Sequence, residues 1–288
     1  MLKSRIIACL TVKEGVVVQS IGFSKFLPVG RPEIAIEFLN SWGVDEIILL
    51  DISAGRLGQL ISCEMITNCS KKCFVPLTAG GGITSVEEAA QLLHAGADKV
   101  TVNSAALVRP ELIQDVAKKF GEQCVVVSID AKKLPSGEYG VFRSGGTDSV
   151  GIAPVEWAQR VRSLGAGEIL INSIDRDGSK LGYDLELTSS VASAVDIPVI
   201  ALGGVGHPQH FIDGLQNGAA AAAAGNFFHF SEHSVITAKS FIAPFAEVRL
   251  DTYADYSSGG FLEDGRVSRK KDKFLQELRF VHYEEEVI

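Results

Sequence analysis

The sequence predicts an α/β fold, a (β/α)8 barrel built from two half-barrel repeats and followed by a C-terminal extension. Short segments rich in Val, Ile, Leu or Ala alternate with amphipathic segments over residues 1–250, the arrangement expected of parallel strands with helices between them. The expected strands cover residues 5–10, 46–51, 75–79, 98–102, 124–129, 168–172, 198–202 and 220–224. The clearest expected helices cover residues 31–42, 86–95, 110–120 and 155–164, with Pro110 suited to the first turn of its helix.

An internal repeat supports the division into two halves. Gly81-Gly82 precedes Gly203-Gly204 by 122 positions, and Gly96 precedes Gly218 by the same number. That offset also carries the expected strand 98–102 onto 220–224. We therefore expect a strand in the alanine run even though alanine favours helix.

Composition and charge exclude several classes of protein. The 288 residues carry a formal net charge of −8, which is unsuited to a general nucleic-acid surface but permits a local pocket for an anion. No apolar run is long enough for a membrane span, and the N-terminal segment is too short and too charged for a signal peptide. With five dispersed cysteines, the chain is expected to be a cytoplasmic protein with reduced thiols.

Cysteines and histidines give no strong metal signal. Cys63, Cys69 and Cys73 form no C-x-x-C pair, and Cys69 and Cys73 would lie one turn apart on an expected helix. We interpret them as small structural side chains, with a metal site as the alternative. His207 and His210 have a spacing that suits a ligand pair, but loop residues are the favoured interpretation. We expect no metal and no cofactor.

Four segments that resemble phosphate-binding loops follow expected strands, two in each half. They cover residues 78–83 and 102–105 in the first half, and 201–206 and 224–227 in the second. Glycine lets backbone N–H groups approach a phosphate closely, and barrel sites form at the carboxyl ends of the strands. The matched pairs predict two phosphate sites on opposite sides of the mouth. Their candidate residues are Gly81, Gly82, Asn103, Ser104, Gly203, Gly204, Gly225 and Asn226.

Specific motifs closely resemble the cyclase subunit of imidazole glycerol phosphate synthase. They are MLKSRIIACLTVK, LLDISA, AGGGI, GADKVTVNSAA, VVVSIDAK, GAGEILINSIDRDG, GYD and AAAGNFFHF. The resemblance implies a glutaminase partner on the N-terminal face of the barrel and passage of ammonia through its interior. At the mouth the family converts a bisphosphorylated ribulosyl substrate, and Asp177 and Gly178 match its ligand-binding residues.

The resemblance also assigns a charged gate at the barrel floor. The matching residues are Arg5, Glu46, Lys99 and Glu168, each at the start of an expected strand. From the residues alone, a structural salt-bridge cluster is the alternative. Asp98 matches a family contact with the glutaminase.

The match breaks at the catalytic end. The family uses two facing carboxylates; Asp130 matches one, whereas the other falls on Thr11, whose hydroxyl is too weak an acid to replace it. After the first strand, the family has a lysine that reaches over the substrate, and the matching position is Gln19. The loop that follows covers residues 20–32. Ser104, Asn226 and Leu202 are further substitutions at or beside the phosphate loops.

Three functions follow as hypotheses. The favoured one resembles a divergent branch in which a glutaminase and a barrel supply ammonia to an ATP-dependent sugar amidotransferase for surface polysaccharide. The second is a working cyclase of histidine biosynthesis with a relocated acid, and the third is a non-catalytic scaffold.

Residues 251–288 extend beyond the family pattern. Their aromatic content is too high for a simple disordered tail, and residues 270–280 could form a short amphipathic helix. We expect the extension to dock on the barrel or on a partner subunit.

Overall fold

Eight parallel strands pair in a closed ring. The computed structural model describes residues 3–231, 233–250, 254, 256, 259–268 and 273. The barrel strands are β1 (Arg5–Lys13), β4 (Glu46–Asp51), β5 (Leu77–Gly80), β6 (Lys99–Val102), β7 (Val125–Lys133), β10 (Glu168–Ser173), β11 (Val199–Leu202) and β12 (Ala221–Ala224). They pair in chain order, and β12 returns to β1 with Arg5 opposite Ala221 and Ala8 opposite Ala224. The predicted (β/α)8 fold is confirmed, including the strand in the alanine run.

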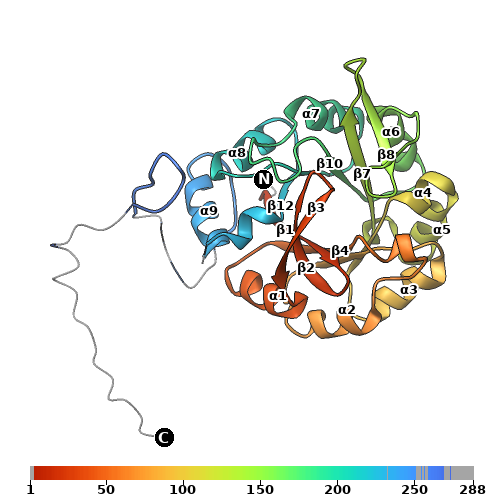
Figure 1. Cartoon of the computed structure of the whole chain (residues 1–288), viewed down its shortest axis with the longest axis horizontal. Helices are drawn as coiled ribbons and strands as arrows, with labels where there is room; N and C mark the ends of the chain where they lie inside the picture. Colours follow the sequence, from red (N-terminus) through yellow and green to blue (C-terminus); the bar gives the residue numbers. More distant parts are fainter. Residues whose placement is uncertain are drawn as a thin grey trace, which may run out of the picture.

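Helices surround the strands (Figure 1). They are α1 (Pro32–Ser41), α2 (Cys63–Ser70), α3 (Val86–His94), α4 (Ser104–Val108), α5 (Glu111–Phe120), α6 (Pro154–Ser163), α7 (Leu185–Ala194), α8 (Pro208–Gln216) and α9 (Ser234–Ile242). Short 3-10 turns are η1 (Gly55–Leu57), η2 (Glu122–Cys124) and η3 (Asn226–His229). Pro110 was predicted to lie in the first turn of its helix; it is instead the N-cap of α5, one residue before that turn. Within the described part of the chain, no helix has the length and apolarity to cross a bilayer.

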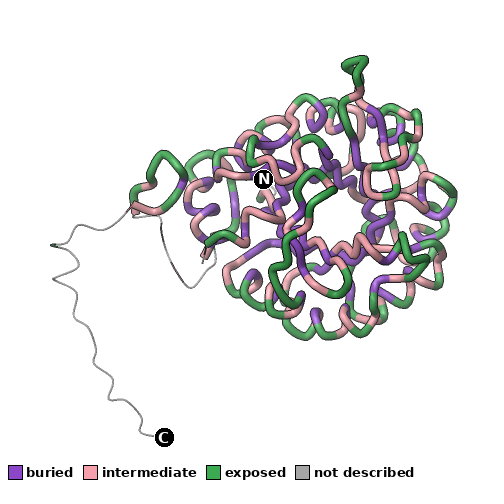
Figure 2. The backbone as a smooth tube through the Cα atoms, in the orientation of Figure 1, coloured by how far each residue is buried: buried purple, intermediate pink, exposed green. Residues whose placement is uncertain are grey.

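Side-chain alternation along the strands separates two apolar layers. In β1, Ile6, Ala8 and Leu10 belong to the layer between strands and helices. Ile7 and Cys9 point the other way and join a cluster inside the barrel. Figure 2 shows the buried strands enclosed by helices whose outer sides are exposed. Because successive side chains in a strand face opposite sides, Arg5 and Thr11 also lie on the inward series of β1.

The segment expected as a loop after β1 is mostly a β-hairpin. Strand β2 (Val16–Ile21) pairs antiparallel with the extended end of β1, and β3 (Lys25–Gly30) pairs with β2. Gly22 and Phe23 lie in the three-residue turn between β2 and β3, and their φ values of 58° and 55° place both in the left-handed region that tight hairpin turns use. The prediction of an irregular loop over 20–32 was wrong, because the hairpin is fixed by contacts with distant parts of the chain. Figure 1 shows it in front of the barrel.

A second hairpin rises from β7. Strand β8 (Tyr139–Arg143) pairs antiparallel with the end of β7, and β9 (Asp148–Ser149) pairs with β8. Both hairpins thus follow the first strand of a half-barrel.

The sequence repeat reappears in the backbone. Gly81 and Gly203 have φ values of 131° and 100°, a region that side chains with a Cβ rarely enter. A Cβ at Gly81 would lie 2.5 Å from the carbonyl oxygen of Asp51, and one at Gly203 would lie 2.9 Å from that of Ser173. The glycine and the carbonyl it contacts are both displaced by the same offset, so the two loops have equivalent geometry.

The described part of the extension contacts α8 and α9. The Tyr256 hydroxyl and His233 Nδ1 are 2.6 Å apart, and the rings of Phe261 and Phe241 meet edge to face at 5.2 Å. His207 Nε2 lies 3.2 Å from the carbonyl oxygen of Glu263. The predicted helix over 270–280 lies outside the described residues, apart from position 273.

A buried ion pair ties the last described helix to the barrel. Lys239 of α9 donates to Asp45 Oδ1 at 2.7 Å and to the carbonyl oxygen of Gly43 at 2.6 Å. The other oxygen of Asp45 accepts the backbone N–H of Ile6 at 2.8 Å. The contact therefore joins α9, the start of β4 and β1.

Replacing Lys239 with methionine should destabilise the protein strongly. The side chains of Lys239 and Asp45 are only 1% and 5% exposed, so the change leaves a buried carboxylate without its cation. We expect a loss of about 3–5 kcal/mol in the free energy of unfolding, measured by urea titration. Lys72→Met is the control, because Lys72 and Glu37 are about half exposed and their pair should contribute under about 1 kcal/mol. Equal losses in the two variants would contradict the assignment.

Candidate functional site

Two bases and two acids meet at the floor of the barrel. Arg5 Nη1 lies 2.7 Å from Glu46 Oε2 and 3.0 Å from Glu168 Oε1. Lys99 Nζ lies 3.0 Å from Glu46 Oε1 and 3.3 Å from Glu168 Oε2. Each base therefore contacts both acids. The four residues expected at the strand starts form one network.

The floor network is neutral and partly removed from solvent. Glu46 is the most buried member, with its side chain 1% exposed, and it also accepts a hydrogen bond from Thr78 Oγ1 at 3.1 Å. Arg5, at 26%, is the most exposed. A buried carboxylate with this many donors is held firmly, because losing them would leave its charge uncompensated. The four side chains therefore form one connected ion-pair network across the floor.

Above the floor, the barrel interior is mainly apolar. Ile7, Cys9, Ile48 and Leu170 belong to the inner cluster. Burial raises the pKa of the Cys9 thiol to about 12, so this sulfur remains protonated. Thr101 is also buried here, and its hydroxyl oxygen has no hydrogen-bond partner within the described chain.

A cavity of about 560 Å³ opens at the carboxyl ends of the strands. All ten residues predicted to bind phosphate or ligand line it: Gly81, Gly82, Asn103, Ser104, Asp177, Gly178, Gly203, Gly204, Gly225 and Asn226. Thr11 and Asp130 line it as well. Gln19 lies in β2 opposite Leu27 and is not among the lining residues, unlike the expectation of a side chain reaching over the site.

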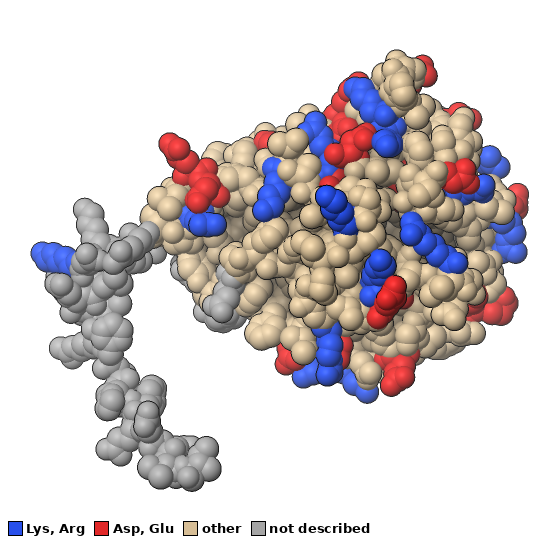
Figure 3. All heavy atoms as spheres, viewed as in Figure 1, with Lys and Arg blue, Asp and Glu red and all other residues tan. Residues whose placement is uncertain are grey.

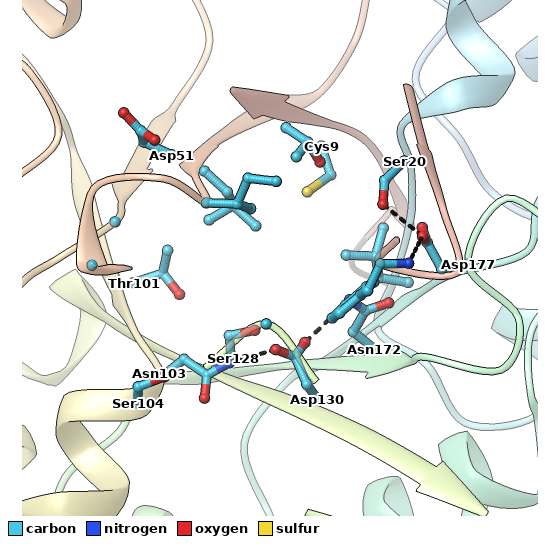
Figure 4. Close-up of a pocket in the computed structure, with 18 of the residues that line it drawn as sticks. Cys9, Ser20, Asp51, Thr101, Asn103, Ser104, Ser128, Asp130, Asn172 and Asp177 are labelled. Atoms are coloured by element: carbon cyan, nitrogen blue, oxygen red, sulfur yellow. Dashed lines mark hydrogen bonds between the residues drawn. The ribbon is translucent and has the colours of Figure 1, made fainter. Parts of the chain in front are cut away.

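Asp130 is the carboxylate most deeply placed in the cavity wall. Its side chain accepts hydrogen bonds from Asn103 Nδ2 at 2.7 Å and Asn172 Nδ2 at 3.2 Å (Figure 4). Burial raises its pKa to about 6, although the two amide donors act in the opposite direction. A carboxyl group with this pKa can exchange protons near neutral pH.

The other cavity carboxylates have structural hydrogen bonds. Asp51 Oδ1 accepts from Ser53 N at 2.8 Å, Ser53 Oγ at 2.5 Å and Ala54 N at 3.1 Å. Asp177 Oδ2 accepts from Ser20 Oγ at 2.6 Å and Phe23 N at 3.1 Å. Each therefore has its hydrogen-bonding role in a loop or hairpin. Burial raises the pKa of Asp177, while its hydrogen bonds from Ser20 and Phe23 act in the opposite direction.

The β2–β3 hairpin is held by the second half of the barrel. Asn226 accepts from Ser20 N at 3.2 Å and donates to Ser20 O at 2.7 Å, a two-point clamp on β2. Figure 4 shows Ser20 and Asp177 next to each other on one side of the cavity, joined by their hydrogen bond. The side chains of Asp177 and Asn226 thus anchor the hairpin.

Several lining residues were not singled out from the sequence. Asn172 lies on the inward series of β10, four positions after Glu168, and that spacing could have identified it. Ser20 and Phe23 enter the site only because the hairpin folds back. Arg56, in η1, also lines the cavity.

Asp98, Cys69 and Cys73 do not line the cavity. Asp98 is exposed next to the floor, and its Oδ2 accepts the backbone N–H of Leu77 at 2.8 Å. Cys69 lies in the last turn of α2, whereas Cys73 follows the helix. The prediction that the two cysteines share a helix was therefore wrong. Burial raises the pKa of the Cys69 thiol to about 12. Across the described residues, no three His, Cys, Asp or Glu side chains gather as a metal site.

The fold and the two polar ends define a (β/α)8 barrel protein with glycine-loop sites at its mouth. The model of one family, described as histidine biosynthesis protein, matches residues 5–234. The chain belongs to this family. The match and the closed barrel agree with the resemblance to the cyclase subunit of imidazole glycerol phosphate synthase.

We expect Asp130 to titrate with a midpoint near 6. The measurement is the chemical shift of its carboxyl carbon, followed by NMR as the pH is changed. Since this pKa lies above the usual value of 3.8, the folded protein binds the proton more tightly than the unfolded chain does. The contribution of Asp130 to stability is therefore greatest below about pH 4 and falls as the pH rises through about 6. Asn172→Leu, which removes a donor to the ionised carboxylate, should move the midpoint further upward. A midpoint near 4 would contradict this description.

Proposed function

We propose that this chain is the barrel subunit of a glutamine amidotransferase and delivers ammonia to a separate enzyme. A glutaminase subunit docks on the floor face, where Asp98 is exposed, and is activated by the barrel. Ammonia enters through the network of Arg5, Glu46, Lys99 and Glu168 and leaves at the mouth. The acceptor is an ATP-dependent sugar amidotransferase that forms an amidino sugar for surface polysaccharide.

The observation that carries this proposal is the absence of an acid at position 11, facing Asp130. Asp130 is poised for proton exchange, whereas the position that the family uses for the facing acid is Thr11. Asp51 and Asp177 are engaged by Ser53 and by the hairpin. A reaction that needs a general acid and a general base loses ~10²–10⁴ in rate when one is missing. Ring closure by this chain is therefore weak or absent.

The floor supports ammonia transfer. Its four charged residues all lie within hydrogen-bond distance of an oppositely charged partner, while the mouth departs from the family pattern. An uncharged ammonia molecule has a lower desolvation cost in the apolar interior than an ammonium ion. A charged entrance followed by an apolar passage thus favours transfer of the neutral molecule.

The glycine loops support a retained phosphate ligand. Gly81-Gly82 in the first half and Gly203-Gly204 in the second expose their backbone at matching positions. The cavity is large enough for a molecule that reaches both loops. Such a ligand, with a phosphate at each end, would lie across the ammonia exit.

The decisive test uses the purified chain with its glutaminase, the ribulosyl substrate and either glutamine or ammonium. We expect glutaminase stimulation but little cyclisation. Cyclisation at the rate of the family would overturn the proposal in favour of a working histidine-pathway cyclase. No stimulation of the glutaminase would favour a scaffold.

Installing the missing acid gives a separate prediction. Thr11→Asp should raise cyclisation with ammonium by ~10²–10⁴ relative to Thr11→Asn, because only the aspartate can exchange a proton. The measurement is the rate of imidazole glycerol phosphate formation. An equal rate in the two variants would show that Thr11 is not what limits ring closure.

A further inference from the structure

We propose that Arg56 binds the phosphate group of a ligand at the glycine loops of the first half, making that site the stronger of the two. This inference rests on the proposed phosphate ligand. It concerns a residue outside the glycine loops and assigns the two ends of the cavity different affinities.

Arg56 lies beside the first-half loops. It is the second residue of η1, and its neighbour Gly55 lies beside Gly82, where a Cβ on Gly55 would be in van der Waals contact with Gly82 N at 3.7 Å. Arg56 itself lines the cavity together with Gly82 and Ser104. The guanidinium is thus carried by the segment that borders the predicted phosphate loop.

The turn between β8 and β9 positions the guanidinium. Nη2 of Arg56 lies 3.4 Å from the carbonyl oxygen of Ser144, and the N–H of Ser144 donates to Ser104 Oγ at 3.1 Å. Gly145 has no side chain, and this leaves room for Arg56 Nη2, because a Cβ on Gly145 would overlap that nitrogen. One short chain of contacts therefore runs from the Ser104 loop to Arg56.

The charge of Arg56 is available. Among the residues that the structure describes, no carboxylate forms an ion pair with it, whereas Arg109 pairs with Asp115 and Arg143 with Asp148. On the opposite wall, Lys180 Nζ lies 4.0 Å from the centre of the Phe230 ring. Figure 3 shows Lys and Arg side chains over the middle of this face and most Asp and Glu toward its edge.

Phosphate is the ligand chemistry that fits. A guanidinium donates two parallel hydrogen bonds to a phosphate, which complements the backbone N–H groups of a glycine loop. On the second-half side the cation that lines the cavity is Lys180, whose ammonium lies over the Phe230 ring and has no planar fork to match a phosphate. The difference between the halves predicts that a phosphate group binds first beside Ser104.

The test follows the backbone amides of Gly82 and Ser104, and separately those of Gly204 and Gly225, by NMR while inorganic phosphate is added at constant ionic strength. In the unmodified protein the first pair should respond at the lower phosphate concentration. Arg56→Ala should weaken binding at that pair about 10- to 100-fold and leave the second pair unchanged. Arg56→Lys, which keeps the charge but loses the planar fork, should fall between them.

Arg109→Ala is the matched control, because it removes the same charge from the same rim but from a paired side chain. It should leave both pairs of amides unchanged. Equal weakening at the two loops, or an equal effect of Arg109→Ala, would overturn the proposal in favour of a general field. No response to phosphate at either loop would overturn it as well, while glutaminase stimulation would still test ammonia delivery independently.

Discussion

Closure of the strand ring is the constraint on which both ends of the molecule depend. Alanines of β12 pair with Arg5–Ala8 of β1, so the first and last barrel strands become neighbours. Once the ring is closed, every second side chain must point into a common interior. Arg5 then joins acids from β4 and β10, although 41 and 163 residues separate them in the chain. The same closure brings the glycine loops of both halves to one mouth.

The inward side chains change character along the barrel axis. In β10, Glu168 at the floor is followed by Leu170 and then by Asn172, which donates to Asp130. In β1 the corresponding order is Arg5, Ile7, Cys9 and Thr11. A charged floor, an apolar middle layer and a polar mouth are three environments stacked within one strand length. A change of function at the mouth can therefore leave the floor intact, because the apolar layer separates them.

The two halves share a backbone design but use their side chains differently. In the second half, Asp177 and Asn226 hold the β2–β3 hairpin, which covers that side of the cavity. Beside the first-half loops, the β8–β9 turn of the second half supports Arg56, which lines the cavity. The repeat gives two similar glycine loops, and the hairpins that follow each first strand make their surroundings unequal.

The sequence by itself determined the barrel, its repeat, the floor residues and the glycine loops, because these depend on local periodicity and on spacing along the chain. Asp130 and the loss of its partner at Thr11 were also apparent there. Only the tertiary structure decided the clamp of Asn226 on Ser20, the buried pair of Lys239 with Asp45 and the support of Arg56 by Ser144. These partners are 206, 194 and 88 residues apart. No local pattern marks such contacts, since they arise only when the closed barrel brings separate loops and helices together.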